Sequence, residues 1–409
     1  MKRGIVIGGG LLLLLLIGGA ASRFLLPGTG PEEGGPDFLE RFWKRPLAPQ
    51  GAPPADFTPL EASLGSEACR ACHPRQFKQW QSSLHSRTMG PGVWWQFRVK
   101  TPEQVKSCMN CHAPLAEQKA LAGQDLGWPG GPSDPRPDYV PADLHRKGLV
   151  CAACHVRGHR RFGPPKADAL PADRAPHHGF AGREAFRNSR FCAGCHQFPD
   201  DGPSLNGKLR ENTYREWRAS RYADQGVTCQ SCHMPDGAHR WRGIHDPAMV
   251  RKGVSASLRA EGDGAGGYRV TAAVANSGAG HKLPTYLTPK LFARLLLIGP
   301  AGDVRKRLDK AVIGWKADVE MTREIFDTRL DPGERIELSG KAARPAGSGW
   351  KVALWLDAAP QRHYERLFRY MFRQKDKMDP ATQRLLETAY KRAQATRFEV
   401  LRKRVPLPP

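Results

Sequence analysis

Acidic residues are scarce in this 409-residue chain, which has 40 Asp and Glu against 63 Lys and Arg and a formal net charge of +23. Such a surplus favours an acidic redox partner or an anionic membrane surface. No nucleic-acid recognition motif accompanies the charge, so we do not expect nucleic acid as a partner. Apolar runs are also rare between residues 58 and 250, which excludes an ordinary hydrophobic core for that stretch.

The chain has no cysteine to spare, because all ten belong to five copies of Cys-x-x-Cys-His. A disulfide framework does not explain a histidine after every pair, and zinc sites combine cysteine pairs with each other or with distant histidines. The spacing is the attachment signature of c-type haem. The thiol pairs are Cys69 and Cys72, Cys108 and Cys111, Cys151 and Cys154, Cys192 and Cys195, and Cys229 and Cys232.

We therefore predict five covalently attached haem c groups. Their proximal iron ligands are the histidines that close the motifs, namely His73, His112, His155, His196 and His233. The sixth position on each iron decides the chemistry. A second strong ligand suits electron transfer, and an open position allows reaction with a substrate.

Nine further histidines can supply sixth ligands. We expect distal ligands among His85, His145, His178, His239, His245 and His281. His178 is preferred over His177, and His245 over His239, while His159 and His363 are expected to be structural. Met89, Met234 and Met249 are alternative axial ligands, although packing is the simpler expectation.

The N-terminus has the features of an export signal. Met1-Lys2-Arg3 is positive, and residues 4–21 carry no charge and include six consecutive leucines. Residues 1–21 are thus a signal peptide or an uncleaved membrane anchor, followed by a Pro/Gly-rich linker at 22–57. Either interpretation predicts a periplasmic or other extracytoplasmic location, because c-type haem is attached there.

The rest of the chain divides into three predicted parts. Residues 58–250 carry one motif about every 40 residues, and we expect short helices and loops around haem. Residues 251–360 show short alternating strands and Gly/Pro turns, as in a β-sandwich. Residues 361–409 are predicted to be a basic helical extension. The predicted fold is a mostly α and irregular multihaem cytochrome domain plus a C-terminal β-sandwich-like domain with terminal helices.

A finer repeat indicates internal duplication. Phe77-x-x-Trp80-x-x-Ser83-x-His85 has the spacing of Tyr214-x-x-Trp217-x-x-Ser220-x-Tyr222, and Gly148-Leu-Val-Cys151 matches Gly226-Val-Thr-Cys229. In the second copy Tyr222 replaces His85, so one repeat lacks its predicted distal ligand.

These motifs resemble the multihaem cytochrome c superfamily that includes hydroxylamine oxidoreductase and its tetrahaem electron-accepting cytochrome. The resemblance rests on the first motif with the Phe77 to His85 turn, on Cys229-Gln-Ser-Cys232-His233-Met234-Pro235, and on the loop Gly280-His281-Lys-Leu-Pro284-Thr285. It implies a distal role for His85 and a fused C-terminal β domain. Pentahaem nitrite reductases of the superfamily usually have one motif that ends in Lys, whereas every motif here ends in His. No specific nitrogen-cycle reaction is therefore implied.

We expect an electron carrier rather than an enzyme, passing electrons between a membrane-linked donor and a redox partner. The alternative is an oxidoreductase that acts on a small nitrogen or sulfur species at one open haem, motivated by Tyr222.

Overall fold

The computed structural model of this protein describes residues 36–129, 135–167, 170–171 and 174–408. The predicted signal or anchor at 1–21 and the first part of the predicted linker, 22–35, lie outside the described residues. Across the described ranges no helix combines the length and apolar character that a membrane span needs.

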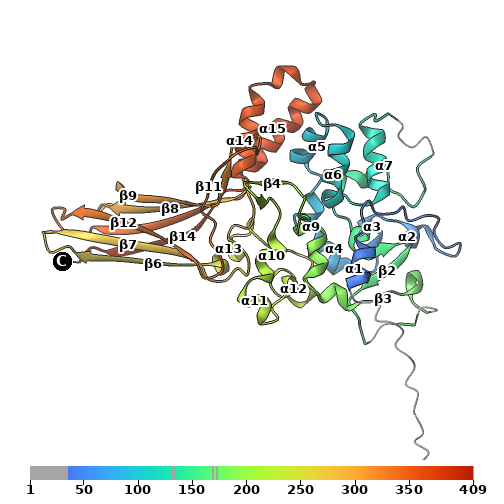
Figure 1. The fold of residues 1–409 in the computed structure, drawn as a ribbon, viewed down its shortest axis with the longest axis horizontal. Helices are drawn as coiled ribbons and strands as arrows, with labels where there is room; N and C mark the ends of the chain where they lie inside the picture. Colours follow the sequence, from blue (N-terminus) through green and yellow to red (C-terminus); the bar gives the residue numbers. More distant parts are fainter. Residues whose placement is uncertain (1–35, 130–134, 168–169, 172–173, 409) are drawn as a thin grey trace, which may run out of the picture. The chain divides into compact units, whose positions relative to one another are not determined.

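Short helices joined by loops make up the part of the chain that carries the motifs (Figure 1). The helices are α1 (Pro36–Phe42), α2 (Pro59–Ala62), α3 (Ser66–Cys69), α4 (Pro74–Gln81), α5 (Pro91–Phe97), α6 (Pro102–His112), α7 (Ala116–Asp125), α8 (Cys151–His155), α9 (Arg190–His196), α10 (Thr213–Arg218), α11 (Arg221–Asp224), α12 (Cys229–His233) and α13 (Pro247–Gly253). The 3-10 turns here are η1 (His85–Arg87), η2 (Leu144–Arg146), η3 (Pro176–His178), η4 (Glu184–Arg187) and η5 (Pro235–Gly237). Short strands are β1 (Val156–Arg157), β2 (Arg160–Gly163), β3 (Ala181–Gly182), β4 (Ser204–Leu205) and β5 (Lys208–Leu209).

Local sequence sets the limits of these helices. α6 begins because the Thr101 side chain accepts a hydrogen bond from Gln104 N, and Pro102 occupies the first helical position, where proline loses no hydrogen bond. It stops at His112 because Pro114 lies two residues later and disfavours helical backbone at Ala113, the residue before it.

The second half of the predicted linker packs against the motif-bearing region instead of tethering it. Phe38, Leu39 and Phe42 of α1 are buried in a cluster with Ala185, against which Phe162 packs. Apolar residues at i, i+1 and i+4 give a helix one apolar face, and the surrounding Pro and Gly obscured this pattern in the sequence.

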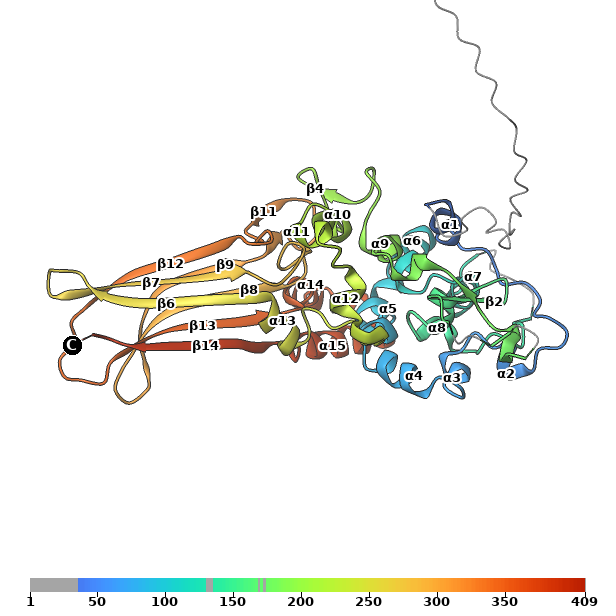
Figure 2. The same cartoon turned by 90° about the horizontal axis from the view of Figure 1, so that it is seen from below.

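Two antiparallel sheets follow α13 (Figure 2). One has the order β12-β7-β6 and the other β14-β13-β8-β9. Their strands are β6 (Val254–Gly262), β7 (Gly267–Asn276), β8 (Lys290–Ile298), β9 (Val304–Ile313), β12 (Arg335–Ala343), β13 (Lys351–Ala359) and β14 (Phe398–Pro406), with β10 (Trp315–Ala317) and β11 (Glu324–Asp327) paired separately.

One hydrophobic cluster draws on both sheets. In β7 the buried residues Tyr268, Val270, Ala272 and Val274 alternate with more exposed ones, as a strand with one buried face requires. They join the same cluster as Leu354 and other residues of β8 and β13. The alternation that predicted a strand at 268–276 therefore defines the inner face of its sheet.

The C-terminal part is helical only at its start. Helices α14 (Arg362–Phe372) and α15 (Pro380–Gln394), with η6 (Lys375–Lys377) between them, pack on α5 through Trp95, Phe368 and Leu386. Residues 398–406 then form β14, which pairs with β13 along its length. This differs from the predicted helical extension, because backbone pairing with a neighbouring strand overrides a basic composition.

Candidate haem-binding site

Each motif lies on or beside one turn of helix. α6, α8, α9 and α12 each end at the motif histidine, and α3 ends at the first cysteine of its motif. Residues three apart share one face of a helix, so the two sulfurs of a motif face the same side and the histidine follows at the helix end.

Sulfur contacts order the motifs in space. The thiol of Cys69 lies beside that of Cys151, and the thiol of Cys192 lies beside that of Cys229. A third such contact joins the second motif to the fourth, through Cys111 and Cys195. The third motif lies near the fourth, because the charge of Cys195 acts on Cys154. All five motifs are therefore connected, and the fourth motif adjoins the second, third and fifth.

The internal repeat is visible in hydrogen bonds. The Trp80 indole N–H donates to Leu149 O (2.6 Å) and that of Trp217 to Val227 O (2.9 Å). The backbone N–H groups of Leu149 and Val227 in turn donate to His85 O and Tyr222 O, each at 2.9 Å. The two copies thus share one local fold, in which motifs one and three correspond to motifs four and five.

Three histidine pairs face each other at a spacing suited to one metal ion between them. The ring centroids are 6.4 Å apart for His85 and His196, 6.0 Å for His155 and His239, and 6.3 Å for His233 and His281. Two imidazoles bound to opposite sides of one metal ion, through bonds of about 2 Å, have centroids about 6.3 Å apart. Each pair joins a motif histidine to one of the predicted distal ligands.

Hydrogen bonds fix the tautomer of most of these rings. A bond from Nδ1–H to a carbonyl leaves the Nε2 lone pair free to bind a metal. The Nδ1 bonds run from His155 to Phe162 O (2.7 Å), His233 to Arg242 O (2.6 Å), His112 to Thr88 O (3.0 Å), His281 to Lys282 O (2.8 Å) and His239 to Gly237 O (2.9 Å).

Burial keeps three of the paired rings neutral, namely His85, His155 and His281. It lowers the pKa of His85 to about 3, and the charges of His196 and His233 add to the effect. Burial also lowers the pKa of His155 and His281 to about 4. At neutral pH these imidazoles carry no charge, which is the form that binds a metal.

His73 has His177 as a neighbour, whereas the sequence favoured His178 of this pair. Burial lowers the pKa of His73, and the charge of His177 lowers it further. His177 and His178 both have left-handed backbone (φ 47° and 56°), which costs energy in a non-glycine residue. The His177 Nδ1–H donates to Gly179 O at 2.9 Å, as in the paired rings above. Its backbone N–H donates to Glu61 Oε1 at 2.8 Å. The sequence signal was the His-His pair, which does not say which ring points inward.

Three other predicted distal ligands have different neighbours. His145 Nε2 is 2.9 Å from Asp125 Oδ2, and the exposed His178 has Nε2 2.7 Å from Asp56 Oδ2. His245 Nε2 accepts from the Gln361 amide at 3.0 Å. The structure brings none of these three rings into contact with a motif histidine.

His112 has no second histidine ring against it within the described part of the chain. Polar side chains lie near its motif instead. Burial raises the pKa of Glu211 to about 8, and the pKa of Tyr364 is raised by burial and by the charges of Glu211 and Cys108. The second motif therefore has a carboxyl and a phenol group nearby, where the paired sites have a second imidazole.

Tyr222 does not leave a haem open in the way the sequence suggested. Its hydroxyl donates to Ser277 O at 3.0 Å, and Gly280, next to His281, packs on its ring. In the first copy of the repeat His85 reaches the fourth motif, and the chain has no further motif after the fifth for Tyr222 to reach. His281 supplies the ring opposite His233.

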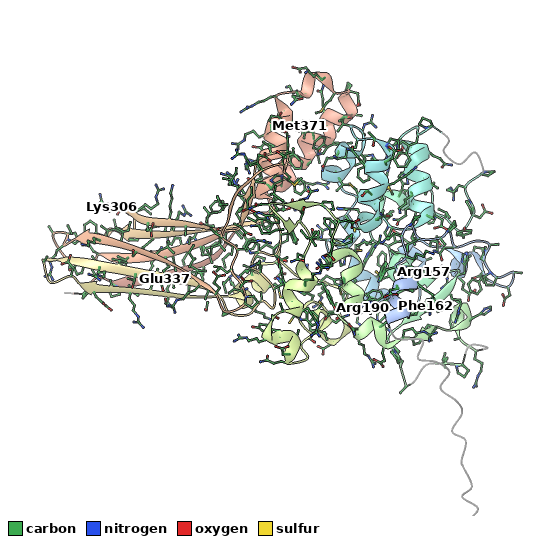
Figure 3. The ribbon with its side chains drawn as sticks, viewed as in Figure 1. Arg157, Phe162, Arg190, Lys306, Glu337 and Met371 are labelled. Carbon is green, nitrogen blue, oxygen red and sulfur yellow. The ribbon has the colours of Figure 1, made fainter. Side chains whose placement is uncertain are left out.

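The donor set fits haem c. Five thiol pairs stand beside motif histidines, three of which face a second imidazole. Buried guanidinium nitrogens of Arg45 and Arg157 lack protein partners. Haem propionates are carboxylates that would pair with such nitrogens. Arg157 also stacks over Phe42 at 4.0 Å, within the helical region where Figure 3 labels it beside Phe162.

Comparisons with known proteins agree with this geometry. The family model described as cytochrome c554 and c-prime matches residues 68–126. The fold is similar to that of a penta-haem cytochrome c552 from Thermochromatium tepidum, with a TM-score of 0.58 and 19% identity over 85% of this chain and 100% of that one. These findings support a multihaem c-type cytochrome. A comparison with curated proteins finds no match.

The family match begins at the first motif and ends after the second. In this cytochrome it covers both α4, which leads to His85, and α6, which carries His112. The structural match extends over most of the chain and shows the fold, while ligand assignments rest on the ring pairs above.

Proposed function

We propose that this protein is an exported electron carrier in which five haems form one relay between a membrane-linked donor and a redox partner. The observation that carries the proposal is the set of histidine pairs at 6.0–6.4 Å, which join residues far apart in the sequence. When bound, haem c supplies iron that accepts and donates single electrons.

The polypeptide would supply the histidine ligands and hold the five attachment motifs close to one another. Paired neutral imidazoles favour the six-coordinate iron suited to electron transfer. Sulfur contacts link motif one to three, four to five, and two to four, and the charge of Cys195 acting on Cys154 places motif three near motif four. Cys72 of the first motif and Cys232 of the fifth are exposed, which supports exchange with partners at both ends of the series.

The partner surface is supported by charge. Arg305, Lys306 and Arg307 are exposed on β9 at the edge of its sheet, where Figure 3 labels Lys306. An acidic partner would be attracted to such a segment. We keep the predicted periplasmic location and membrane-linked donor as parts of this proposal.

Reduction kinetics test the relay. In the holoprotein, all five haems should be reduced by a quinol-linked donor and reoxidised by one acceptor, without turnover of nitrite, hydroxylamine or sulfite. Reduction that stops at a fixed fraction of the haems, however strong the donor, would contradict a connected series.

A second function is favoured by the surroundings of His112. A haem without a second histidine can bind a small nitrogen or sulfur species, and Tyr364 and Glu211 lie near that motif. Turnover of nitrite, hydroxylamine or sulfite with a reduced dye tests this oxidoreductase. Tyr364→Phe should slow turnover, and Tyr370→Phe on the same helix should not. Equal rates in the two variants, or no turnover in the parent protein, would remove the second function.

A further inference from the structure

The ring opposite His233 comes from the sheet region. His281 lies in the loop between β7 and β8, whereas His233 ends α12. The rings are stacked at 6.3 Å with an interplanar angle of 16°. Because the loop joins β7 and β8 of the two sheets, contacts with the motif-bearing helices are needed to hold His281 opposite His233.

A buried carboxylate on α10 makes that connection. The Glu216 side chain is 5% exposed. Its Oε2 accepts from the backbone N–H of Lys282 at 3.2 Å and from the Thr285 hydroxyl at 2.6 Å. Glu216 thus holds the loop at Lys282, directly after His281, and again at Thr285, three residues further on.

Arg329 completes the connection from the sheet side. Its side chain is 3% exposed, and Nη1 donates to Glu216 Oε1 at 3.3 Å and to Thr285 O at 2.7 Å. Two parallel hydrogen bonds of 2.9 and 2.8 Å tie it to Asp327, and it stacks over Trp315 at 4.4 Å. Such a two-pronged bond fixes the guanidinium direction.

The sheet holds the other side of the loop. The Asn276 amide donates to His281 O at 2.9 Å and to Leu330 O at 3.0 Å. Asn276 closes β7, so this contact would persist if the loop left α10. On the helix side, the Thr285 hydroxyl also contacts Thr213 Oγ1 of α10 at 2.7 Å, and Tyr222 of α11 contacts Ser277 and Gly280. Among the contacts that seat the loop on the motif-bearing helices, Glu216 is the buried charged one.

We propose that Glu216 and Arg329 are positioning residues that seat His281 opposite His233. The proposal rests on the proposed pairing of His281 with the fifth haem. Burying an ion pair is a weak way to gain stability, but the pair joins two layers and fixes a loop. Removing the carboxylate takes away the acceptor of the Lys282 N–H. Arg329 keeps its bonds to Asp327 and Thr285 O, and the Thr285 hydroxyl keeps its contact with Thr213.

The test uses ferric holoprotein with Glu216→Ala and Glu216→Gln. In Glu216→Ala one of the five haems should change from low-spin to high-spin, and added imidazole should restore the low-spin signal. Glu216→Gln keeps one acceptor oxygen for the loop, so its change should be smaller. The electron paramagnetic resonance signals of the other four haems should keep their positions.

Glu365→Gln and Glu365→Ala are matched controls. Glu365 is 1% exposed and paired with Arg362 and Arg397, but it lies on α14 and has no contact with the His281 loop. These variants should lose stability without a change of spin state. If Glu216→Ala loses stability to the same extent and keeps all parent signals, its role is only structural and the proposal is overturned. His281→Ala separates the two levels, because an unchanged spectrum there would refute the pairing itself.

Discussion

The two neighbouring histidines of η3 offer a test in which structure and sequence disagree. The structure brings the charge of His177 to bear on His73, whereas the sequence favoured His178. His177→Ala should remove the sixth ligand of the first haem. His178→Ala should remove only an exposed contact with Asp56 and leave the haem unchanged.

The structure sets the size of the effect. Four of the five motif histidines have a histidine neighbour, and His112 is the exception among the described residues. The parent protein should therefore show about 20% high-spin haem, one in five, if no other side chain binds that iron. His177→Ala should raise the share to about 40%, two in five.

Quantified electron paramagnetic resonance of the ferric protein measures both shares in one experiment. Adding imidazole to His177→Ala should return the high-spin share toward the parent value, because the vacated position accepts a free ligand. If His178→Ala raises the share and His177→Ala does not, the structural assignment is wrong. If neither variant changes it, the first haem has another sixth ligand.

Three further predictions concern stability and association. Burial alone would raise the pKa of Asp327, but hydrogen bonds from Arg329 and Lys208 hold it below its ordinary value, so this carboxylate stabilises the fold above about pH 4 and the stabilisation is lost as the pH falls. Asp327→Asn should therefore unfold at a lower denaturant concentration at pH 7 and lose less stability on acidification. Parallel pH profiles of the free energy of unfolding in the two proteins would contradict this. Leu386 of α15 is fully buried between α5 and α14. Leu386→Ala should therefore lower the free energy of unfolding by about 2–5 kcal/mol, as measured by denaturant titration. A loss near zero would mean that α15 does not pack there. Electron transfer to an acidic partner should slow in stopped-flow traces as salt shortens the Debye length from about 30 Å at 0.01 M to about 3 Å at 1 M, whereas a salt-independent rate would argue against charge-guided docking.

Much of the fold could be predicted from local pattern. The alternation at 268–276 predicted a strand because a sheet with one buried face needs a period of two. Short helices around haem were predicted for residues 58–250 because that stretch has too few apolar runs for an ordinary core. β14 could not be predicted, because its state depends on pairing with β13, about 50 residues earlier in the chain.

The sequence by itself determined the haem attachment sites and their proximal histidines, because covalent attachment needs only residues that are adjacent along the chain. Which histidine rings face each other was decided by tertiary structure. His85 faces His196, and His281 crosses from the sheet region to His233, and neither distance along the chain carries a signal. His145 and His245 show the reverse, since Asp125 and Gln361 engage their nitrogens only after folding. An imidazole can serve as ligand, hydrogen-bond donor or acceptor, and only the folded neighbourhood selects among these roles.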